Sequence, residues 1–368
     1  MERVKSVTVR IAGIDTEFVE KTQSRLDNLT KPQGSLGRLE ELAKQICGIT
    51  AKDNPQLSKK VIFTMASDHG VTDEGVSAYP KEVTAQMVYN FLRGGAGINV
   101  LAKHAGAKVI VVDMGVAESI EVSKCQSIKV SECQGVKEIE FINRKIGFGT
   151  KNMTKGPAMS RDEAIKAICA GMEIFHNEFK RNGIDIAGTG EMGIGNTTAS
   201  SAITACFTEK PVEEVVGKGT GIDDKALANK INVIKKSISV NTPDPKDAID
   251  VLSKVGGFEI AGLAGIILAA ASEKVPVVID GFISGAAALV AFGIEPKVKD
   301  YMIAAHCSVE KGHKIILDYI GLKPLLNMDL KLGEGTGAAL AIGLADASIK
   351  ILTQMATFKS ANVSERQK

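Results

Sequence analysis

The sequence predicts an α/β protein in which a parallel sheet is covered by helices on both faces. Short apolar, β-branched runs alternate along the chain with longer segments of helical periodicity, as in successive β-α-β units. Toward both ends the pattern becomes helical, up to about Asp53 and again from Thr336 to about Met355. We therefore expect residues 54–335 to form the α/β domain, and residues 1–53 and about 336–368 to form a small helical subdomain.

The individual elements follow from this alternation. Strands are expected where the apolar runs are short, and helices where the apolar residues recur with helical spacing. The expected strands are Lys60–Ala66, Lys108–Asp113, Ile184–Ala187, Val275–Asp280 and Tyr301–Ala305. The expected helices between or after them are Arg161–Arg181, Asp224–Ile238, Pro245–Lys254 and Val309–Ile320.

Composition excludes several classes of protein. The chain has 368 residues, 44% of them apolar and 24% charged, and a formal net charge of only +2, which is typical of a globular enzyme. Without a basic stripe, and with four Tyr and no Trp, it offers little to nucleic acid. The N-terminus lacks a signal-peptide h-region, and the longest apolar stretch, near Ile260–Ala271, is too short and Gly-rich to span a bilayer. We expect a cytoplasmic protein that binds neither nucleic acid nor membrane.

The six scattered cysteines contain no C-x-x-C pair, and we interpret them as small buried hydrophobic residues.

Polar and glycine-rich residues follow the expected strands. In open parallel sheets, ligands bind beyond the carboxyl ends of the strands, so these stretches are expected to form the site. They are Ser67–Gly70, Gly188–Gly193, Gly281–Ser284 and His306–Ser308.

The stretch GTGEMGIGNTTAS, residues 188–200, allows more than one interpretation. Its first six residues match the dinucleotide fingerprint G-x-G-x-x-G, which expects an acid about 20 residues later at the end of a second strand. That region is the loop FTEKPVEE, with no strand before Glu209. Gly193 and Gly195, followed by Asn196 and Thr197, fit a monophosphate site at a helix N-terminus better. A plain glycine-rich turn before a helix is the alternative.

A second glycine loop, within VVGKGTGIDDKALANKINVI (215–234), supplies two candidate phosphate cations. These are Lys218 and Lys230, and either one is alternatively an ordinary solvated lysine.

A metal site is not expected. Six residues near the strand ends could in principle be drawn together, but their spacing matches neither H-E-x-x-H nor a facial triad. They are Asp68, His69, Asp73, Glu74, His306 and Glu310.

One acid stands alone among small residues. In KLGEGTGAAL (331–340), Glu334 is flanked by Gly333 and Gly335. An isolated carboxylate is costly to bury, and glycines offer it no side-chain partners.

Taken together, these loops resemble one family, the nicotinate-nucleotide–dimethylbenzimidazole phosphoribosyltransferases, which make the lower-ligand nucleotide of cobamides. The resemblance covers nearly the whole chain in family order. It rests on LTKPQGSLGRLEELA (29–43), SDHGVTDEGVSAYPKEVTAQM (67–87), RGGAGINVLAKHAGAKVIVVDMGV (93–116), GEMGIGNTT (190–198), GKGTGIDD (217–224), VVIDGFISGAAA (277–288), AHCSVEKGH (305–313) and LGEGTGAALA (332–341).

The resemblance implies a Rossmann-like sheet domain with a small helical domain from both chain ends. It also implies a reaction that needs no metal or organic cofactor. The 5-phosphoribosyl group moves from nicotinate mononucleotide to an aromatic base, giving an α-linked nucleotide 5′-phosphate and nicotinate. The implied assembly is a homodimer, or a heterodimer with a related subunit.

The resemblance also implies residue roles. Glu334 would be the general base, since burial raises a carboxylate pKa toward neutrality, and Glu191 would be a supporting second acid. Asp280 would reach the ribose hydroxyls. The 5′-phosphate would be held by Gly193, Gly195, Asn196, Thr197, Lys230 and Ser308, and the substrate would also lie beside Gly333 and Gly335. The acceptor pocket would be formed by Tyr79, Gln86, Met87 and Leu332.

The acceptor stretch departs from the family pattern. Family members often carry a small polar residue at the position of Tyr79 and Gln at that of Met87. This bulkier, more apolar wall suits acceptors other than the family's dimethylbenzimidazole, such as purines, simpler benzimidazoles or phenols, so the acceptor stays open. Two other functions stay open at this point: an NAD(P)-dependent oxidoreductase, and a catalytically silent nucleotide-binding subunit of a heteromer.

Overall fold

The core of the protein is a six-stranded sheet in which every pairing is parallel. The computed structural model describes residues 1–121, 139–219 and 221–364. The strand order is β3-β2-β1-β4-β5-β6, the order of doubly wound nucleotide-binding sheets. The strands are β1 (Lys60–Ser67), β2 (Lys108–Gly115), β3 (Glu140–Asn143), β4 (Ile186–Met192), β5 (Val277–Ile279) and β6 (Met302–Ala304). The predicted α/β class with a Rossmann-like sheet is confirmed.

Two strands differ from the sequence prediction. The four-residue edge strand β3, EFIN, was not predicted; it is short and pairs only with β2. Strand β4 extends beyond the predicted end at Ala187 and includes most of the glycine-rich stretch up to Met192. Glycine is unfavourable within strands unless another backbone approaches closely. Here a Cβ at Gly190 would lie 2.2 Å from the carbonyl oxygen of Glu334, so the space is already filled.

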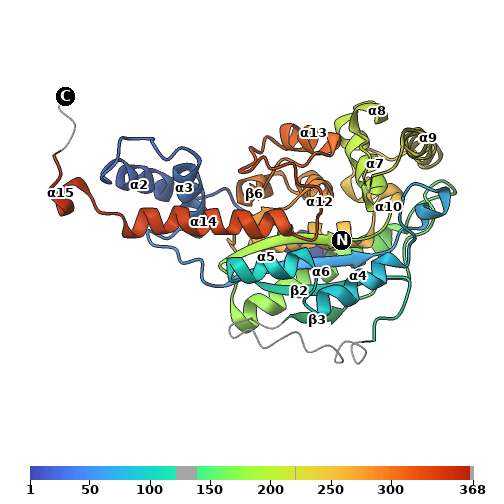
Figure 1. Cartoon of the computed structure of the whole chain (residues 1–368), viewed down its shortest axis with the longest axis horizontal. Helices are drawn as coiled ribbons and strands as arrows, with labels where there is room; N and C mark the ends of the chain where they lie inside the picture. The colour runs from blue at the N-terminus through green and yellow to red at the C-terminus, as the bar shows by residue number, and fades with distance from the viewer. Residues whose placement is uncertain (122–138, 220, 365–368) are drawn as a thin grey trace.

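Helices cover both faces of the sheet (Figure 1). The longer helices are α2 (Thr16–Asp27), α3 (Arg38–Thr50), α4 (Val83–Leu92), α5 (Gly97–Ala105), α6 (Arg161–Asn182), α7 (Asn196–Thr208), α9 (Asp224–Asn241), α10 (Ala248–Val255), α11 (Phe258–Ser272), α12 (Phe282–Ile294), α13 (Lys311–Ile320) and α14 (Thr336–Gln354). Short helices are α1 (Glu2–Thr8), α8 (Val212–Val215), α15 (Phe358–Ala361) and the 3₁₀ turns η1 (Gly70–Glu74) and η3 (Pro296–Tyr301).

Side-chain alternation in β1 separates two hydrophobic cores. Phe63 and Met65 belong to the core that contains α6 and α11. Ile62 and Ala66 belong to the core that contains α5 and α14, on the opposite face. This period of two is what a strand buried on both faces requires.

The cysteines that the structure describes are free thiols. Cys47 is fully buried, while Cys169, Cys206 and Cys307 are half-buried, so the prediction of small buried residues holds strictly for Cys47 alone among these. The other two cysteines, at positions 125 and 133, lie outside the described residues.

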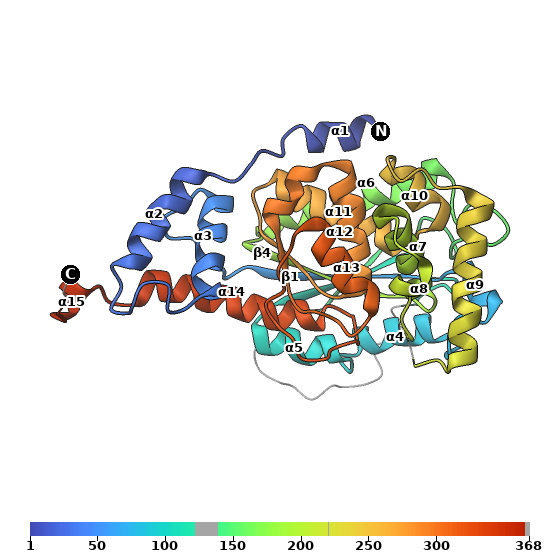
Figure 2. The same cartoon turned by 90° about the horizontal axis from the view of Figure 1, so that it is seen from above.

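Helices α2 and α3 pack beside the distal part of α14, and the C-terminal helix α15 lies just beyond its end (Figure 2). A buried ion pair, Lys31 to Glu40 at 2.8 Å, holds the loop before α3. Helix α1 instead packs on α6 and α11. The division into two domains stays a prediction.

Helix α14 connects this helical end to the sheet. Among the described residues it is the one helix whose length and composition would allow a membrane crossing. More than half of its most apolar stretch is buried, and it packs against α3, α5, β4 and β5. It is therefore built as a core helix.

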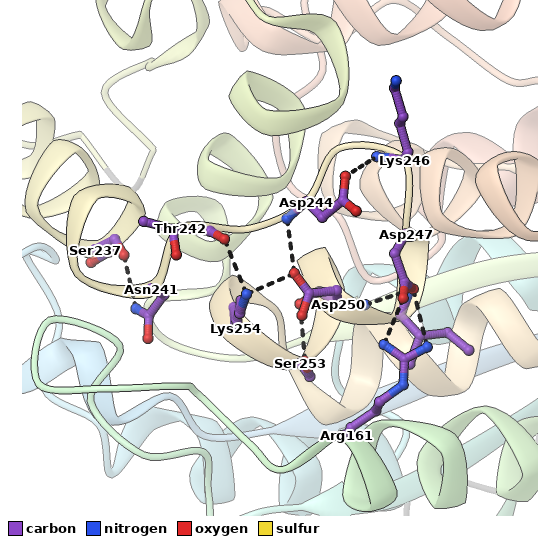
Figure 3. Close-up of polar contacts among 11 residues, drawn as sticks. Arg161, Ser237, Asn241, Thr242, Asp244, Lys246, Asp247, Asp250, Ser253 and Lys254 are labelled. Carbon is purple, nitrogen blue, oxygen red and sulfur yellow. Dashed lines mark hydrogen bonds and ion pairs between the residues drawn. The ribbon is translucent and has the colours of Figure 1, made fainter.

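The two ends of α9 are fixed by polar contacts. Asp223 caps its N-terminus by accepting the N–H of Ala226 at 2.8 Å. Beyond its C-terminus, the ammonium of Lys254 donates to the carbonyl of Thr242 at 3.0 Å and to Asp250 at 2.8 Å (Figure 3). These contacts hold a helix that carries one of the predicted phosphate ligands.

Candidate active site

A cavity of about 380 Å³ opens where the carboxyl ends of β4, β5 and β6 meet the loop before α14. Its position is the one expected for ligands of open parallel sheets. Residues from widely separated stretches line it: Tyr79, Val83, Met87, Glu191, Met192, Gly193, Ile194, Asn196, Thr197, Gly219, Gly281, Phe282, Ile283, His306, Ser308, Glu310, Lys331, Leu332, Gly333 and Glu334.

Glu334 lies in this cavity and is held by the start of helix α5. The carboxylate oxygen Oε2 accepts the backbone N–H of Ile98 at 3.0 Å, and the N–H of Gly97 also points to the carboxylate. The side chain is only 4% exposed. Burial raises the pKa of Glu334, and the two backbone N–H groups partly oppose this effect. The result is a carboxylate whose proton affinity is higher than usual.

The backbone around Glu334 has an uncommon conformation. Gly333, Glu334 and Gly335 have φ angles of 80°, 63° and 98°, so three successive residues are left-handed. Glutamate rarely adopts this conformation, which costs energy that the surroundings must offset. The hydroxyl of Thr64 donates to the carbonyl of Glu334 at 3.0 Å. Asp280 accepts the N–H groups of Gly335 and Ala338 at 3.2 and 2.9 Å, which caps α14.

Glu191, at the end of β4, is a second buried acid in the cavity. It is 6% exposed and accepts a hydrogen bond from the amide of Asn196. Burial, followed by repulsion from Asp280 and Glu259, raises the pKa of Glu191 to about 8. Burial likewise raises the pKa of Asp280 to about 7, against the opposing effect of the α14 N–H groups. Near neutral pH, Glu191 is therefore mainly protonated.

One corner of the cavity has the features of an anion site. Lys230 on α9 is 1% exposed, and its ammonium donates to the hydroxyl of Thr197 at 2.8 Å. Burial lowers the pKa of Lys230 to about 8. The ammonium lies beside the start of α7, whose cap residue Gly195 has no side chain to bond the first N–H groups. A buried cation and a free helix N-terminus together favour a phosphate.

The loop after β6 adds a third group of residues. The N–H of Ser308 donates to Nδ1 of His313 at 2.9 Å. Burial lowers the pKa of His313 to about 3, so this ring is neutral and accepts at Nδ1. His313 thereby fixes the loop that carries Ser308 and Glu310 into the cavity.

Most of the predicted site residues come together in this one cavity. The predicted residues that line it are Glu334, Glu191, Gly193, Asn196, Thr197, Ser308, Gly333, Tyr79, Met87 and Leu332. Lys230 reaches it through Thr197, while Gly195 and Gly335 stand at the starts of α7 and α14.

Two predicted residues lie elsewhere. Gln86 is exposed and does not line the cavity. Helix α4 presents Val83 and Met87, one turn apart, to the cavity, and this leaves Gln86 on another face. Asp280 is 1% exposed, and its oxygens accept backbone N–H groups of α14 instead of lining the cavity. Its contact with ribose stays a prediction.

Some cavity residues were given no substrate role from the sequence. They are Phe282 and Ile283, and also His306 and Glu310, which were considered only as metal ligands. The first two are apolar and carry no chemical signal, and the other two are ambiguous. The N–H groups of Gly97 and Ile98 have no sequence signature at all, because backbone donors are common to every residue.

The candidate metal ligands are distributed among separate hydrogen bonds. Oδ2 of Asp68 accepts the N–H of Ala117 at 2.7 Å, and Glu74 accepts from Asn152 at 2.7 Å. His69 pairs with Glu259. Within the described ranges, no group of three or more His, Cys, Asp or Glu side chains is placed to hold a metal ion.

The G-x-G-x-x-G stretch does not form a dinucleotide turn. Five of its six positions, from Gly188 to Met192, lie within β4, so only Gly193 belongs to the turn before α7. After α7 the chain continues into the helices α8 and α9 and not into a strand.

The doubly wound sheet, the anion corner and the adjacent buried carboxylates define a nucleotide-binding group-transfer enzyme. A family model described as phosphoribosyltransferase matches residues 11–363. The nicotinate-nucleotide–dimethylbenzimidazole phosphoribosyltransferase of Geobacter sulfurreducens is 56% identical over 97% of both chains. The protein of that name from Desulforudis audaxviator is 52% identical over 99% of both. The crystal structure of CobT from Thermus thermophilus superposes with a TM-score of 0.86 at 40% identity, covering 95% of this chain and all of that one.

The chain therefore belongs to the nicotinate-nucleotide–dimethylbenzimidazole phosphoribosyltransferase family. It is a pentosyltransferase, and its place in cobamide lower-ligand synthesis follows from this membership. The predicted family, enzyme class and function are confirmed.

Proposed function

We propose that this cavity transfers the 5-phosphoribosyl group of nicotinate mononucleotide to an aromatic base, with Glu334 as the general base. The observation that carries the proposal is the position of Glu334. Its carboxylate is buried, has a raised pKa and lies in the same cavity as the anion corner around Lys230 and Thr197. A base is thus available to a substrate whose phosphate is bound a short distance away.

The donor would be anchored at its phosphate. The ammonium of Lys230, the hydroxyl of Thr197 and the N–H groups at the start of α7 supply positive charge and donors. Ser308 also lines the cavity and completes this anchor. Lys331 lines the cavity as well and pairs with no acid among the described residues, so we assign the carboxylate of the nicotinate ring to it.

The reaction then needs one proton transfer. The C1′–N bond of the donor breaks, its electron pair remains on the ring nitrogen, and nicotinate leaves as a neutral pyridine ring bearing its carboxylate. A nitrogen of the acceptor forms the new bond to C1′ from the opposite face, which gives the α-linked product. The N–H proton of the acceptor passes to the carboxylate of Glu334. General-base catalysis of this kind contributes roughly 10²–10⁴-fold.

Glu191 would support this step in its protonated form. Its amide partner Asn196 occupies Oε2, which leaves Oε1 as the oxygen next to Gly333 and the reacting region. A neutral Glu191 lets Glu334 be ionised before the transfer, because a second negative charge beside Glu334 would raise its pKa further.

The acceptor would bind between the loop before α4 and the loop before α14. This part of the cavity is apolar, because it is lined by Tyr79, Met87, Met192 and Leu332. A flat aromatic ring is the ligand that such a wall favours. Dimethylbenzimidazole is the acceptor in the names of the relatives. A phenol fits the same wall and would attack through oxygen.

Assembly as a dimer belongs to this proposal. Tyr79 and Leu332 line the cavity, yet they are 54% and 60% exposed. A second copy of the chain, or a related subunit, would shield them from water. Size-exclusion chromatography coupled to light scattering measures this oligomeric state. We propose a cytoplasmic location, which cell fractionation tests.

The function itself is tested with purified protein and nicotinate mononucleotide. Dimethylbenzimidazole, other benzimidazoles, purines and phenols are supplied one at a time, and mass spectrometry identifies the ribotide products. Release of nicotinate with formation of at least one ribotide supports the proposal. If nicotinate is released with none of the acceptors, the proposal is contradicted. If the protein binds nicotinate mononucleotide but does not turn it over, it is a silent subunit.

A further inference from the structure

A buried histidine–glutamate pair lies beneath the turn that connects β4 to α7. Nε2 of His69 is 2.7 Å from Oε1 of Glu259, and the two side chains are 1% and 0% exposed. His69 follows β1, and Glu259 stands in the first turn of α11. Neither residue lines the cavity, and Glu259 enters the chemistry proposed above only through its repulsion of Glu191.

The turn rests directly on His69. A Cβ at Gly193 would lie 3.4 Å from both Cδ2 and Nε2 of the ring, and 2.4 Å from the carbonyl of Ser67. A Cβ at Gly195 would lie 3.3 Å from Cβ of His69. Gly193 lines the cavity and Gly195 caps α7. The His69 side chain is therefore one of the groups on which the turn before α7 rests, together with the carbonyl of Ser67 and the side chain of Thr72.

Charge ties the ring to α11. Burial lowers the pKa of His69, but the neighbouring Glu259 carboxylate outweighs this effect and the pKa is raised overall, with Asp68 adding to the increase. The raised pKa favours the protonated ring, which is the form that donates most strongly to Glu259. The second oxygen of Glu259 has no hydrogen-bond partner among the described residues. Loss of His69 would leave a buried carboxylate uncompensated, which is far more costly than loss of an exposed pair.

We propose that His69 and Glu259 are positioning residues for the phosphate corner. They hold the Gly193–Gly195 turn from beneath and so set the affinity for the donor's 5′-phosphate, without contacting the substrate. The proposal rests on the phosphate assignment made under Proposed function, and it adds a determinant outside the cavity.

The test uses ribose 5-phosphate as the probe, because it carries the phosphate and lacks the nicotinate ring. Its dissociation constant is measured by calorimetry with the full chain. We expect His69→Ala and Glu259→Ala each to weaken binding about tenfold or more, corresponding to ~1.4 kcal/mol. Glu259→Gln keeps an oxygen acceptor for Nε2, so the ring can stay in place as a neutral imidazole that donates to the amide oxygen, and binding should stay within about threefold of the parent. The double variant His69→Ala/Glu259→Ala should resemble the single variants, since both remove one support.

Steady-state kinetics separate positioning from chemistry. The KM for nicotinate mononucleotide should rise in the weakened variants, while in His69→Ala, which keeps Glu259 beside Glu191, kcat and the KM for the acceptor stay near the parent values. His176→Ala is the matched control, because His176 pairs with Glu273 at 3.1 Å at the far end of the same helix α11. This variant should leave both KM values unchanged.

Several outcomes would overturn the proposal. One is an unchanged affinity for ribose 5-phosphate in a folded His69→Ala variant, as judged by circular dichroism. Others are a fall in kcat at constant KM, or an equal effect of His176→Ala. If His69→Ala does not fold, His69→Gln, which keeps an N–H donor, takes its place beside Glu259→Ala. Should the parent bind the probe yet transfer no phosphoribosyl group, the proposed function fails while the positioning result still stands.

Discussion

Oε2 of Glu334 accepts the backbone N–H of Ile98 at 3.0 Å, and this bond joins the proposed base to the N-terminus of α5. The contact has two effects. It orients the carboxylate, leaving Oε1 for the substrate, and it keeps the pKa from rising as far as burial alone would take it. A general base works best when its pKa is near the working pH, so the two opposing effects suit the role.

Glu334→Gln removes the base without changing the size of the side chain. We expect kcat to fall by roughly 10²–10⁴-fold, while the affinity for nicotinate mononucleotide changes little. Nicotinate release, followed by chromatography, measures this. Asp329→Asn is the control, since Asp329 is an exposed acid of the same segment. Turnover near the parent rate in Glu334→Gln would show that the acceptor loses its proton elsewhere.

Gly97→Ala tests the orientation of the base. The new methyl group would lie 2.8 Å from Leu332 and 3.3 Å from Oε2 of Glu334. We expect it to displace the carboxylate and to lower kcat by about tenfold or more, because a displacement of about 1 Å is enough for a large loss. Gly106→Ala is not a suitable control, since Gly106 has a φ of 66°. Val100→Ala, at an exposed position of the same helix, is suitable and should leave kcat unchanged.

Lys230→Met should weaken function and strengthen the fold. Loss of a charged hydrogen bond to phosphate is worth about 1.5–3 kcal/mol, or roughly 10–100-fold in the KM for nicotinate mononucleotide. In the absence of substrate, the variant no longer buries an ammonium whose pKa is lowered to about 8, so the melting temperature should rise. Calorimetry and kinetics measure the two effects. Lys225→Met, at an exposed position of α9, should change neither.

Stability should depend on pH through Glu191. Its pKa in the folded protein is about 8, against an ordinary value of 4.5, so the folded state holds the proton more tightly than the unfolded state. The associated stability is fully present below about pH 4.5 and is lost as the pH rises toward 8. We expect the melting temperature of the substrate-free protein to fall over this range. Glu191→Gln should flatten the slope, and an unchanged slope would contradict the raised pKa. Asp280, with a pKa of about 7, contributes in the same direction and remains in the variant.

Acceptor choice should respond to Met87. Met87→Gln introduces an amide into the apolar wall formed with Tyr79 and Leu332. We expect kcat/KM for phenol to fall relative to dimethylbenzimidazole by about tenfold, because the new amide can bond a ring nitrogen that phenol lacks, and one pocket contact produces an effect of this size. Competition between the two acceptors in one reaction gives the ratio directly. Gln86→Met, on the face of α4 that leads away from the cavity, should leave the ratio unaltered.

Much of this fold could be predicted because its strands are apolar on both faces. The runs that became β1 and β2 are continuous and rich in Val and Ile, and no other element explains them. Strand β4 was predicted too short because its second half, GTGEM, contains residues that disfavour strands. Contact with the Glu334 loop in the folded protein overrides that local preference, and the local sequence contains no sign of this contact.

The candidate site, too, could be predicted where a local sequence pattern existed and not where only the folded chain creates the contact. Side chains with a chemical signature, such as Glu334 and Lys230, could be assigned from the sequence. Gln86 was assigned by the family resemblance together with Met87, but a helix turns about 100° per residue, so adjacent residues face different ways. Asp280 was likewise assigned by the resemblance, yet its oxygens accept N–H groups that only the folded chain brings to it.

Helix α14 begins two residues after Glu334 and continues for 19 residues to the helical end of the molecule. The α2–α3 pair and the C-terminal helix α15 are thus linked to Glu334, the proposed base, through a helix of roughly 28 Å. Removing α2 and α3, or ending the chain before α15, would loosen the far end of that helix, so turnover should fall before the parallel sheet unfolds. Variants made for activity measurements should therefore keep both of these segments intact.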